Sequence, residues 1–175
     1  MTTTAVEATQ QGKVRIQNIL QIGLVVEDLY ETMRHYWEVL GIGPWNIYII
    51  RPPELTDAAV HGIPQSYSFK AAIAQVGNIQ WELIQPLSEN NIYREFLDQK
   101  GGGLHHVLVA VENFDDTMQQ LNKGGMGVLM QGTWRGFTWS YADTEKRLGA
   151  IFEFFKTQPD WAMSGPDEIY PPQAE

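Results

Sequence analysis

Cysteine is absent from this chain of 175 residues. That absence excludes disulfides and thiolate metal sites, so any metal site has to use oxygen and nitrogen donors. It also fits a cytoplasmic protein, because disulfides are rare in the cytoplasm. No apolar run approaches the roughly 20 residues that cross a membrane. Met1–Gly12 is polar and lacks the apolar stretch of a signal peptide. We therefore expect a cytoplasmic protein with no membrane partner.

Basic residues are scarce as well. Twelve Lys and Arg stand against 21 Asp and Glu, which gives a net charge of −9. Such a charge disfavours nucleic acid and anionic membrane surfaces as partners. Hydrophobic residues make up 43% of the chain, enough for one domain with its own core. A small-molecule substrate is the partner that these numbers leave open.

Two stretches of the chain repeat each other. Gln21–Met33 matches His106–Met118 with an offset of 85 residues, and Gln80–Ile84 matches Ile151–Phe155 with an offset of 71. The difference fits an insertion in the first copy around Arg51–Gln65, whose prolines and glycine predict a loop. Duplicated modules that each place a donor early and a carboxylate late indicate one shared site built from both halves.

Each repeat unit predicts a strand, a helix and three further strands. An apolar strand over Ile19–Val26 is followed by Asp28 as a helix cap. Leu104–Val111 is followed by Asn113 in the same way, and Gly101–Gly103 ends a helix that links the two units. The expected organisation is a flexible tail over 1–16, a first βαβββ module over 17–87, a linker helix over 88–103, a second βαβββ module over 104–156 and a C-terminal tail over 157–175.

Four residues of the repeat are candidate metal ligands. Side chains alternate along a strand, so if the two units curl into one open barrel, Gln21, Glu82, His106 and Glu153 converge on its concave face. An amide oxygen, an imidazole and two carboxylates suit Zn²⁺, Ni²⁺, Co²⁺, Mn²⁺ or Fe²⁺. Buried carboxylates also need a cation to offset their desolvation. We therefore predict one divalent metal ion as cofactor.

Three local motifs, together with this ligand pattern, identify a family resemblance. Trp81–Leu87, Ile92–Leu97 and Gly102–Val107 resemble segments of methylmalonyl-CoA epimerases. Over roughly 19–155 the chain resembles the vicinal oxygen chelate superfamily, which includes glyoxalase I, these epimerases, extradiol dioxygenases and bleomycin-resistance proteins. The resemblance implies an α+β fold with a mixed eight-stranded open barrel, and it places the family's metal positions on Gln21, Glu82, His106 and Glu153. Epimerases usually have His at the first position; the Gln/Glu/His/Glu set is similar to that of eukaryotic-type glyoxalase I.

For the other histidines and the aromatic residues the sequence supports less specific predictions. By strand alternation His105 faces away from His106, which predicts a hydrogen-bonded core histidine. His61, in the insertion, is a surface residue or a pocket residue. Aromatic residues in strands are more often core than ligand-binding, but the hairpin before Glu153 borders the pocket in this fold. Candidate substrate-binding residues are Trp45, Tyr48, His61, Trp134, Phe137, Trp139 and Tyr141. Epimerases usually have a more basic or small-residue segment at this hairpin, so its aromatic residues argue against a CoA thioester. They predict instead a substrate with an apolar or aromatic body and a carbonyl head.

The sequence leaves three functions open. The first is a metal-dependent lyase, isomerase or epimerase, in which Glu153, or second Glu82, moves a proton next to a carbonyl. The second is a metal-free binding or resistance protein of the same fold. The third is an extradiol dioxygenase, which is disfavoured because that chemistry uses two His and one carboxylate on Fe²⁺. We also expect a homodimer, with the Pro-rich tail as a clasp through the apolar residues Trp161, Met163, Ile169 and Tyr170.

Overall fold

The structure is a computed structural model that describes residues 13–172. Most of the tail expected over 1–16 lies outside these residues, as does the end of the C-terminal tail, and the first strand already begins at Ile16. In chain order the elements are β1 (Ile16–Val25), α2 (Leu29–Leu40), β2 (Trp45–Ile50), β3 (Leu55–Val60), β4 (Ile63–Pro64), β5 (Phe69–Val76), β6 (Ile79–Pro86), α3 (Ile92–Lys100), β7 (Gly103–Val111), α4 (Phe114–Lys123), β8 (Val128–Trp134), β9 (Phe137–Ala142), α5 (Glu145–Leu148), β10 (Ile151–Thr157) and β11 (Glu168–Tyr170).

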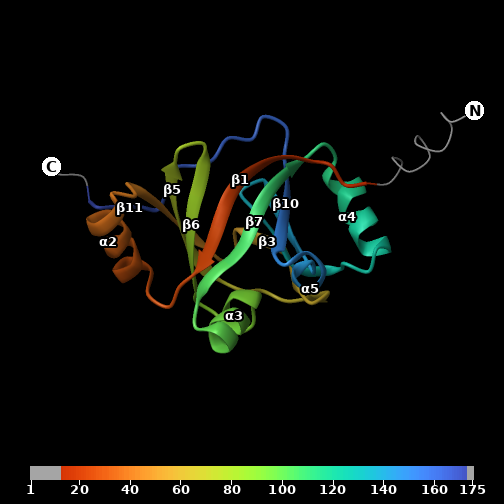
Figure 1. Cartoon of the computed structure of the whole chain (residues 1–175), viewed down its shortest axis with the longest axis horizontal. Helices are drawn as coiled ribbons and strands as arrows, with labels where there is room; N and C mark the ends of the chain where they lie inside the picture. Colours follow the sequence, from red (N-terminus) through yellow and green to blue (C-terminus); the bar gives the residue numbers. More distant parts are fainter. Residues whose placement is uncertain (1–12, 173–175) are drawn as a thin grey trace, which may run out of the picture.

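One mixed sheet contains all the strands of the described residues, in the order β11-β2-β5-β6-β1-β7-β10-β9-β8-β3-β4. At its centre β1 and β7 pair antiparallel, and each runs parallel to a strand on its other side, β6 and β10 respectively. The order β2-β5-β6-β1 is thus mirrored by β8-β9-β10-β7. Figure 1 shows the central part of this order from left to right as β5, β6, β1, β7 and β10. The α+β class and the mixed sheet are confirmed.

The sheet has eleven strands, so the expectation of eight was wrong. β3 and β4 lie in the segment expected to be a loop, and β11 lies in the expected tail. β3 pairs with β8, and β11 pairs with β2, so each added strand covers one outer edge of the eight-stranded core. Unpaired edge strands expose backbone hydrogen-bonding groups, which these additions satisfy at β2 and β8. The prolines misled the prediction because they flank β3 or sit in the edge strand β4, where a missing N–H is tolerated.

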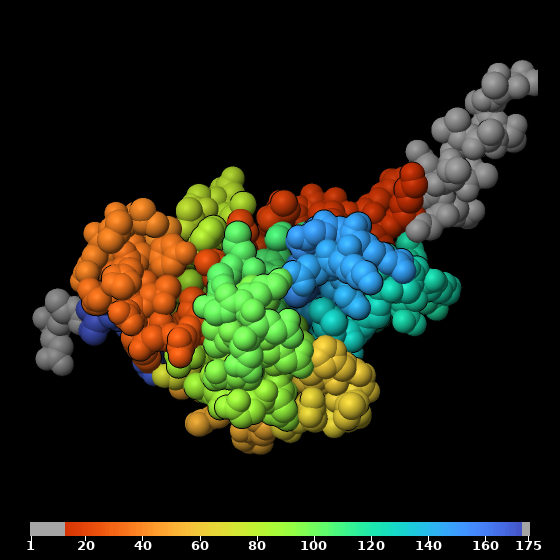
Figure 2. Space-filling model, turned by 60° about the horizontal axis from the view of Figure 1, so that its bottom comes forward, coloured from red at the N-terminus to blue at the C-terminus, as the bar shows by residue number. Residues whose placement is uncertain are grey.

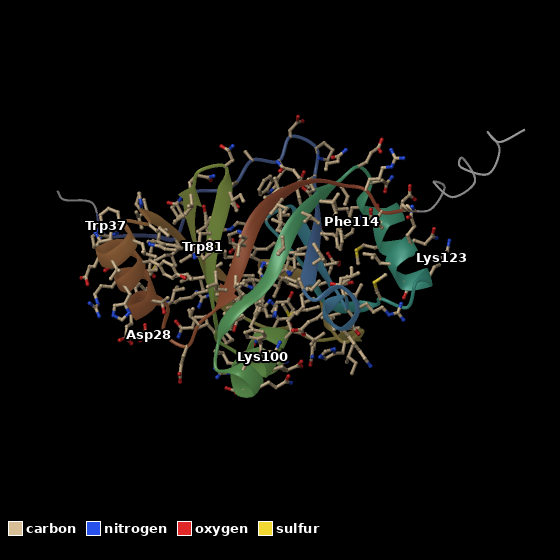
Figure 3. All side chains as sticks on the ribbon, viewed as in Figure 1. Asp28, Trp37, Trp81, Lys100, Phe114 and Lys123 are labelled. Carbon is tan, nitrogen blue, oxygen red and sulfur yellow. The ribbon has the colours of Figure 1, made fainter. Side chains whose placement is uncertain are left out.

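Helices α2 and α4 cover the face of the sheet opposite the functional site. Both begin with the same cap: the side chain of Asp28 accepts from the N–H of Glu31, and Asn113 accepts from Asp116, each at 2.9 Å. Leu29 and Met33 of α2 pack on buried residues of β2, β5 and β6, and Leu121 of α4 packs on β7, β9 and β10. Figure 3 labels Asp28 and Phe114 at the two helix starts, toward the left and right ends of the molecule in this view.

Helix α3 closes one end of the other face. Its buried residues Ile92, Tyr93 and Phe96 join the largest apolar cluster, which draws members from both halves of the sheet. Figure 2 views this end, where α3 and the start of β7 (green) occupy the middle of the surface. No helix among residues 13–172 has both the length and the hydropathy that crossing a membrane requires.

Candidate functional site

The strand register brings the four predicted ligands into two neighbouring rows at the centre of the sheet. Gln21 of β1 lies opposite Leu108 of β7, and His106 of β7 lies opposite Gly23 of β1. Glu82 is the neighbour of Gly23 on β6, and Glu153 is the neighbour of Leu108 on β10. The register is therefore twofold symmetric, as the sequence repeat predicts, and it places donors from four adjacent strands on one face.

Gly23 makes room for the imidazole of His106. A Cβ atom at Gly23 would lie 1.9 Å from His106 Cε1 and 2.4 Å from Nε2. The ring therefore lies directly over the backbone of β1, where only glycine leaves space for it. This close approach holds His106 Nε2 toward the carboxylates of the flanking strands.

His106 contacts both carboxylates. Its Nε2 lies 3.0 Å from Glu153 Oε2 and 3.3 Å from Glu82 Oε2, and all three residues are buried, with exposed fractions of 2%, 5% and 7%. Burial alone lowers the pKa of His106, but the negative charge of Glu153 and the contacts with both carboxylates raise it to about 9. Burial also raises the pKa of Glu82, against the opposing effect of His106.

The donor atoms of this group fit a divalent ion. His106 Nε2 and Glu153 Oε2 are buried without a hydrogen bond of proper geometry, although they lie close together. Two ligand atoms bound to one ion at about 2.1 Å are about 3.0–3.4 Å apart, which matches the N···O distances here. No group of three or more His, Asp or Glu side chains in residues 13–172 is already arranged to hold an ion. The donor types and their spacing therefore suit a metal ion. In this structure the same side chains contact one another directly.

Gln21 lies beside this group. Its side chain is buried, faces the same cavity as the two glutamates, and donates a long hydrogen bond from Nε2 to Gln80 Oε1 at 3.4 Å. That contact engages the nitrogen and leaves the amide oxygen of Gln21 available as a donor to a cation.

The group lies against a cavity of about 380 Å³ on the inner face of the sheet. Its walls are mainly apolar and aromatic, while Gln21, Glu82 and Glu153 contribute polar groups. Strands from both modules contribute to the lining, so the cavity lies between the two halves of the sheet. A volume of this size and lining suits a small organic molecule.

A segment near the C-terminus covers part of this cavity. In residues 158–164, called here the C-terminal cover, Trp161 and Met163 line the cavity. The ring of Trp161 packs 5.5 Å from that of Phe137, and its Nε1 donates to the carbonyl of Arg135 at 3.0 Å. Arg135 in turn donates to Ser164 at 3.1 Å and pairs with both carboxylate oxygens of Glu54. The cover is thus tied to the β8–β9 turn and to the loop before β3.

Most of the aromatic residues predicted for the pocket do line the cavity; these are Tyr48, Trp134, Phe137, Trp139 and Tyr141. Trp45 does not, because it is fully buried beneath α2 with Leu29 and Met33. His61 does not either: it is exposed, and its Nε2 contacts Glu95 at 3.0 Å. The prediction that Trp45 and His61 line the cavity was therefore wrong. Strand alternation places the side chain of Trp45 on the face that α2 covers, and the turn after β3 places His61 outside the cavity.

The prediction for His105 was also wrong in its direction. Gly23 pairs with His106 and Leu24 pairs with Leu104, so His105 is the extra residue of a β-bulge in β7. The bulge turns its side chain toward that of His106, and the two Nδ1 atoms lie 3.1 Å apart. Burial, with the neighbouring His106 charge, lowers the pKa of His105 well below its ordinary value, so its ring stays neutral.

Sequence reasoning missed the cover and the amide residues of the cavity. Trp161 and Met163 had been assigned to a dimer clasp, but they line the cavity of their own chain. Tyr170 of β11 packs near α2 and pairs with Trp45. The homodimer stays a prediction, although these contacts remove part of its basis. The polar residues Gln75, Asn78 and Gln80 lie together at the tip of the β5–β6 hairpin, where Gln75 pairs with Gln80, and this cluster of amide side chains was a signal for a polar wall.

A model of the glyoxalase/bleomycin resistance protein/dioxygenase superfamily matches residues 20–142. The chain belongs to this superfamily. The match includes Gln21, Glu82 and His106, whereas Glu153 and the C-terminal cover lie beyond it.

Similar proteins include methylmalonyl-CoA epimerases. The mitochondrial epimerase of Mus musculus is 26% identical over 110 residues, which are 62% of this chain and 54% of that protein. The chain thus spans about half the length of the curated relatives it matches. The epimerase from Mycobacterium tuberculosis has a TM-score of 0.61 at 17% identity, covering 84% of this chain and 92% of that one. A methylmalonyl-CoA epimerase in complex with methylmalonyl-CoA and NH₄⁺ has a TM-score of 0.63 at 17% identity, covering 83% and 97%. At these identities the structures establish a shared fold.

The space above Gly23 gives a first testable prediction. In Gly23→Ala the new Cβ would force His106 away from Glu82 and Glu153, since the strand backbone cannot yield. We expect the free energy of unfolding to fall by about 1–3 kcal/mol, the usual cost of overpacking, as measured by urea denaturation. Gly127→Ala is the control, because a Cβ there meets nothing within 4 Å. Equal stability of the two variants would show that His106 does not need this space.

Proposed function

We propose that this chain is a divalent-metal-dependent isomerase or epimerase, or a lyase of the same chemical type, that moves a proton next to a carbonyl group. The observation that carries this proposal is the buried group of His106, Glu82 and Glu153 against an aromatic-walled cavity. Buried carboxylates beside a substrate-sized cavity are typical of sites for acid–base chemistry. The similarity to methylmalonyl-CoA epimerases over about half of their length supports the reaction class.

The ion would be held by Gln21, Glu82, His106 and Glu153. It would supply Lewis acidity, which lowers the energy of the negative charge that develops when a carbon next to a carbonyl loses its proton. His106 gives the only nitrogen donor of this set, and the two carboxylates give charge that balances the ion. Which divalent metal binds is set by availability as much as by these donors.

Glu153 is the first candidate for the base that removes and returns the proton, and Glu82 is the second. The two stand on β10 and β6, on either side of the central strands, and both line the cavity. Glu153 Oε2 lies 3.0 Å from His106 Nε2 but makes no hydrogen bond of proper geometry, and a carboxylate has several lone pairs, so Glu153 can still accept a proton. The apolar walls limit access of bulk water, so the carboxylates rather than the solvent exchange protons with the substrate.

The lining of the cavity supports a small substrate with an apolar or aromatic body. Trp134, Phe137 and Trp139 form one wall, and the C-terminal cover narrows the opening with Trp161. Arg135 is the cation among the lining residues, and its guanidinium already pairs with Glu54. Little positive charge is therefore left at the cavity for the phosphates of a CoA thioester.

A second candidate function is binding of an apolar ligand without a metal. One observation favours it: His106 already pairs with both carboxylates, and a protonated His106 offsets part of their charge without an ion. Metal content separates the two functions. An extradiol dioxygenase is the third and least favoured candidate, because Glu82, His106 and Glu153 offer one imidazole and two carboxylates rather than the reverse.

Replacement of the assigned base tests the reaction directly. Glu153→Gln keeps the size and an oxygen donor but cannot accept a proton, so we expect at least a 100-fold slower exchange of the α-proton. The measurement is deuterium incorporation from D₂O by NMR, over a panel of small aryl carbonyl compounds with methylmalonyl-CoA for comparison. Glu112→Gln, an exposed substitution at the end of β7, is the matched control. Exchange by Glu153→Gln at the wild-type rate would remove Glu153 from the role of base.

Opening the C-terminal cover tests the substrate class. Trp161→Ala removes the contact with Phe137 and widens the cavity, so bulky aryl carbonyl compounds should gain about tenfold in kcat/KM relative to small ones, roughly 1.4 kcal/mol. Steady-state kinetics on a graded series measures this ratio. Trp37→Ala is the control, since Trp37 is 40% exposed on α2 (Figure 3). An unchanged ratio in Trp161→Ala would mean that the cover does not select by size.

A further inference from the structure

Two consecutive histidines of β7 lie side by side, which a regular strand does not allow. In a regular strand neighbouring side chains point to opposite faces. The bulge at His105 breaks this alternation, because Gly23 and Leu24 of β1 pair with His106 and Leu104 and skip the residue between them. Both imidazoles are consequently buried, and their Nδ1 atoms are 3.1 Å apart. Bulges often re-aim one side chain at a functional site.

Aromatic rings fix the position of His105. The rings of Tyr93 and Phe96, both from α3, make T-shaped contacts with it at centroid distances of 5.3 and 5.0 Å, and Tyr141 of β9 does so at 5.8 Å. Tyr141 also contacts His106 at 4.9 Å, and its hydroxyl is 2.8 Å from that of Tyr93. Rings from two elements, α3 and β9, thus hold the two imidazoles in one arrangement. A histidine that only filled space would not need to present Nδ1 to its neighbour.

The chemistry of the Nδ1···Nδ1 contact requires one proton between the two rings. A neutral imidazole has one N–H and one lone pair. If His106 Nε2 binds a cation between Glu82 and Glu153, the proton of His106 has to be on Nδ1. His105 Nδ1 is then the acceptor, and the proton of His105 is on its Nε2.

We propose that His105 is a positioning residue: its Nδ1 accepts the Nδ1–H of His106 and so fixes the tautomer and ring orientation with which His106 Nε2 binds the divalent ion. This inference rests on the metal-dependent function proposed above. Hydrogen-bond partners of metal-binding histidines typically change metal affinity by about 10–100-fold when removed. His105 does not contact the substrate cavity and acts through His106 alone.

Three variants separate positioning from packing. His105→Phe keeps an aromatic ring in the cage but removes the acceptor, whereas His105→Asn carries an oxygen near the position of Nδ1. Phe96→Leu is the matched control, because it disturbs the same aromatic cage without touching the hydrogen bond. Zn²⁺ affinity, measured by competition with a chromogenic chelator, should fall by about 10–100-fold in His105→Phe. We expect His105→Asn to recover most of that loss and Phe96→Leu to bind Zn²⁺ within about threefold of wild type.

The tautomer gives a readout that does not depend on activity. In ¹⁵N NMR of the zinc-loaded protein, we expect the proton of His106 on Nδ1 and that of His105 on Nε2. The inference is overturned if His105→Phe binds Zn²⁺ like wild type, if Phe96→Leu loses as much affinity as His105→Phe, or if His106 carries its proton on Nε2. In each of these outcomes wild-type binding of Zn²⁺ still supports the metal-dependent function. If wild-type protein binds no Zn²⁺, that function fails and the positioning role fails with it.

Discussion

Burying two carboxylates and an imidazole together is the constraint on which the rest of this structure depends. An isolated buried carboxylate is costly, and the attraction between buried charges repays desolvation only when the geometry is good. Here Glu82 and Glu153 share one partner, His106, and two ionised carboxylates carry more negative charge than a single imidazolium balances. A divalent cation would balance that charge and bind the buried atoms that lack hydrogen bonds.

The twofold register is what assembles this group. Two copies of one βαβββ unit meet through β1 and β7, and each copy contributes one residue from its first strand and one from its last. Symmetry alone would give two equivalent halves, but the site differs between them. The first copy has Gln21 where the second has His106. Gly23 of the first copy has no side chain and so leaves room for the imidazole of His106 in the second copy. The insertion with β3 and the segment that ends in β11 then extend the sheet at both edges, and the second of these segments lines the cavity with Trp161 and Met163.

Much of the fold and the convergence of the four candidate ligands could be predicted because repeats and strand alternation are local signals. The repeat pairs Gln21 with His106 and Glu82 with Glu153, strand alternation favours one shared face for them, and the family resemblance implies the same four positions. The bulge at His105 could not be predicted, since it depends on how β7 pairs with β1 rather than on the residues of β7 alone. The edge strands β3 and β11 were missed for a similar reason: they pair with strands distant in sequence, and their prolines resemble those of loops. For Trp45 the residue type alone was a poor guide. Because side chains alternate along a strand, an aromatic residue that is shifted by one position faces the helices instead of the cavity.

The position of a bound ion tests the central claim most directly. Crystals of zinc-loaded protein should be measured by anomalous diffraction on both sides of the zinc absorption edge. We predict one anomalous peak per chain, with His106 Nε2 and carboxylate oxygens of Glu82 and Glu153 at about 2.0–2.2 Å and the amide oxygen of Gln21 facing the ion. A chain without a peak at these residues, in crystals soaked with excess zinc, would contradict a metal centre and leave binding without a metal as the function.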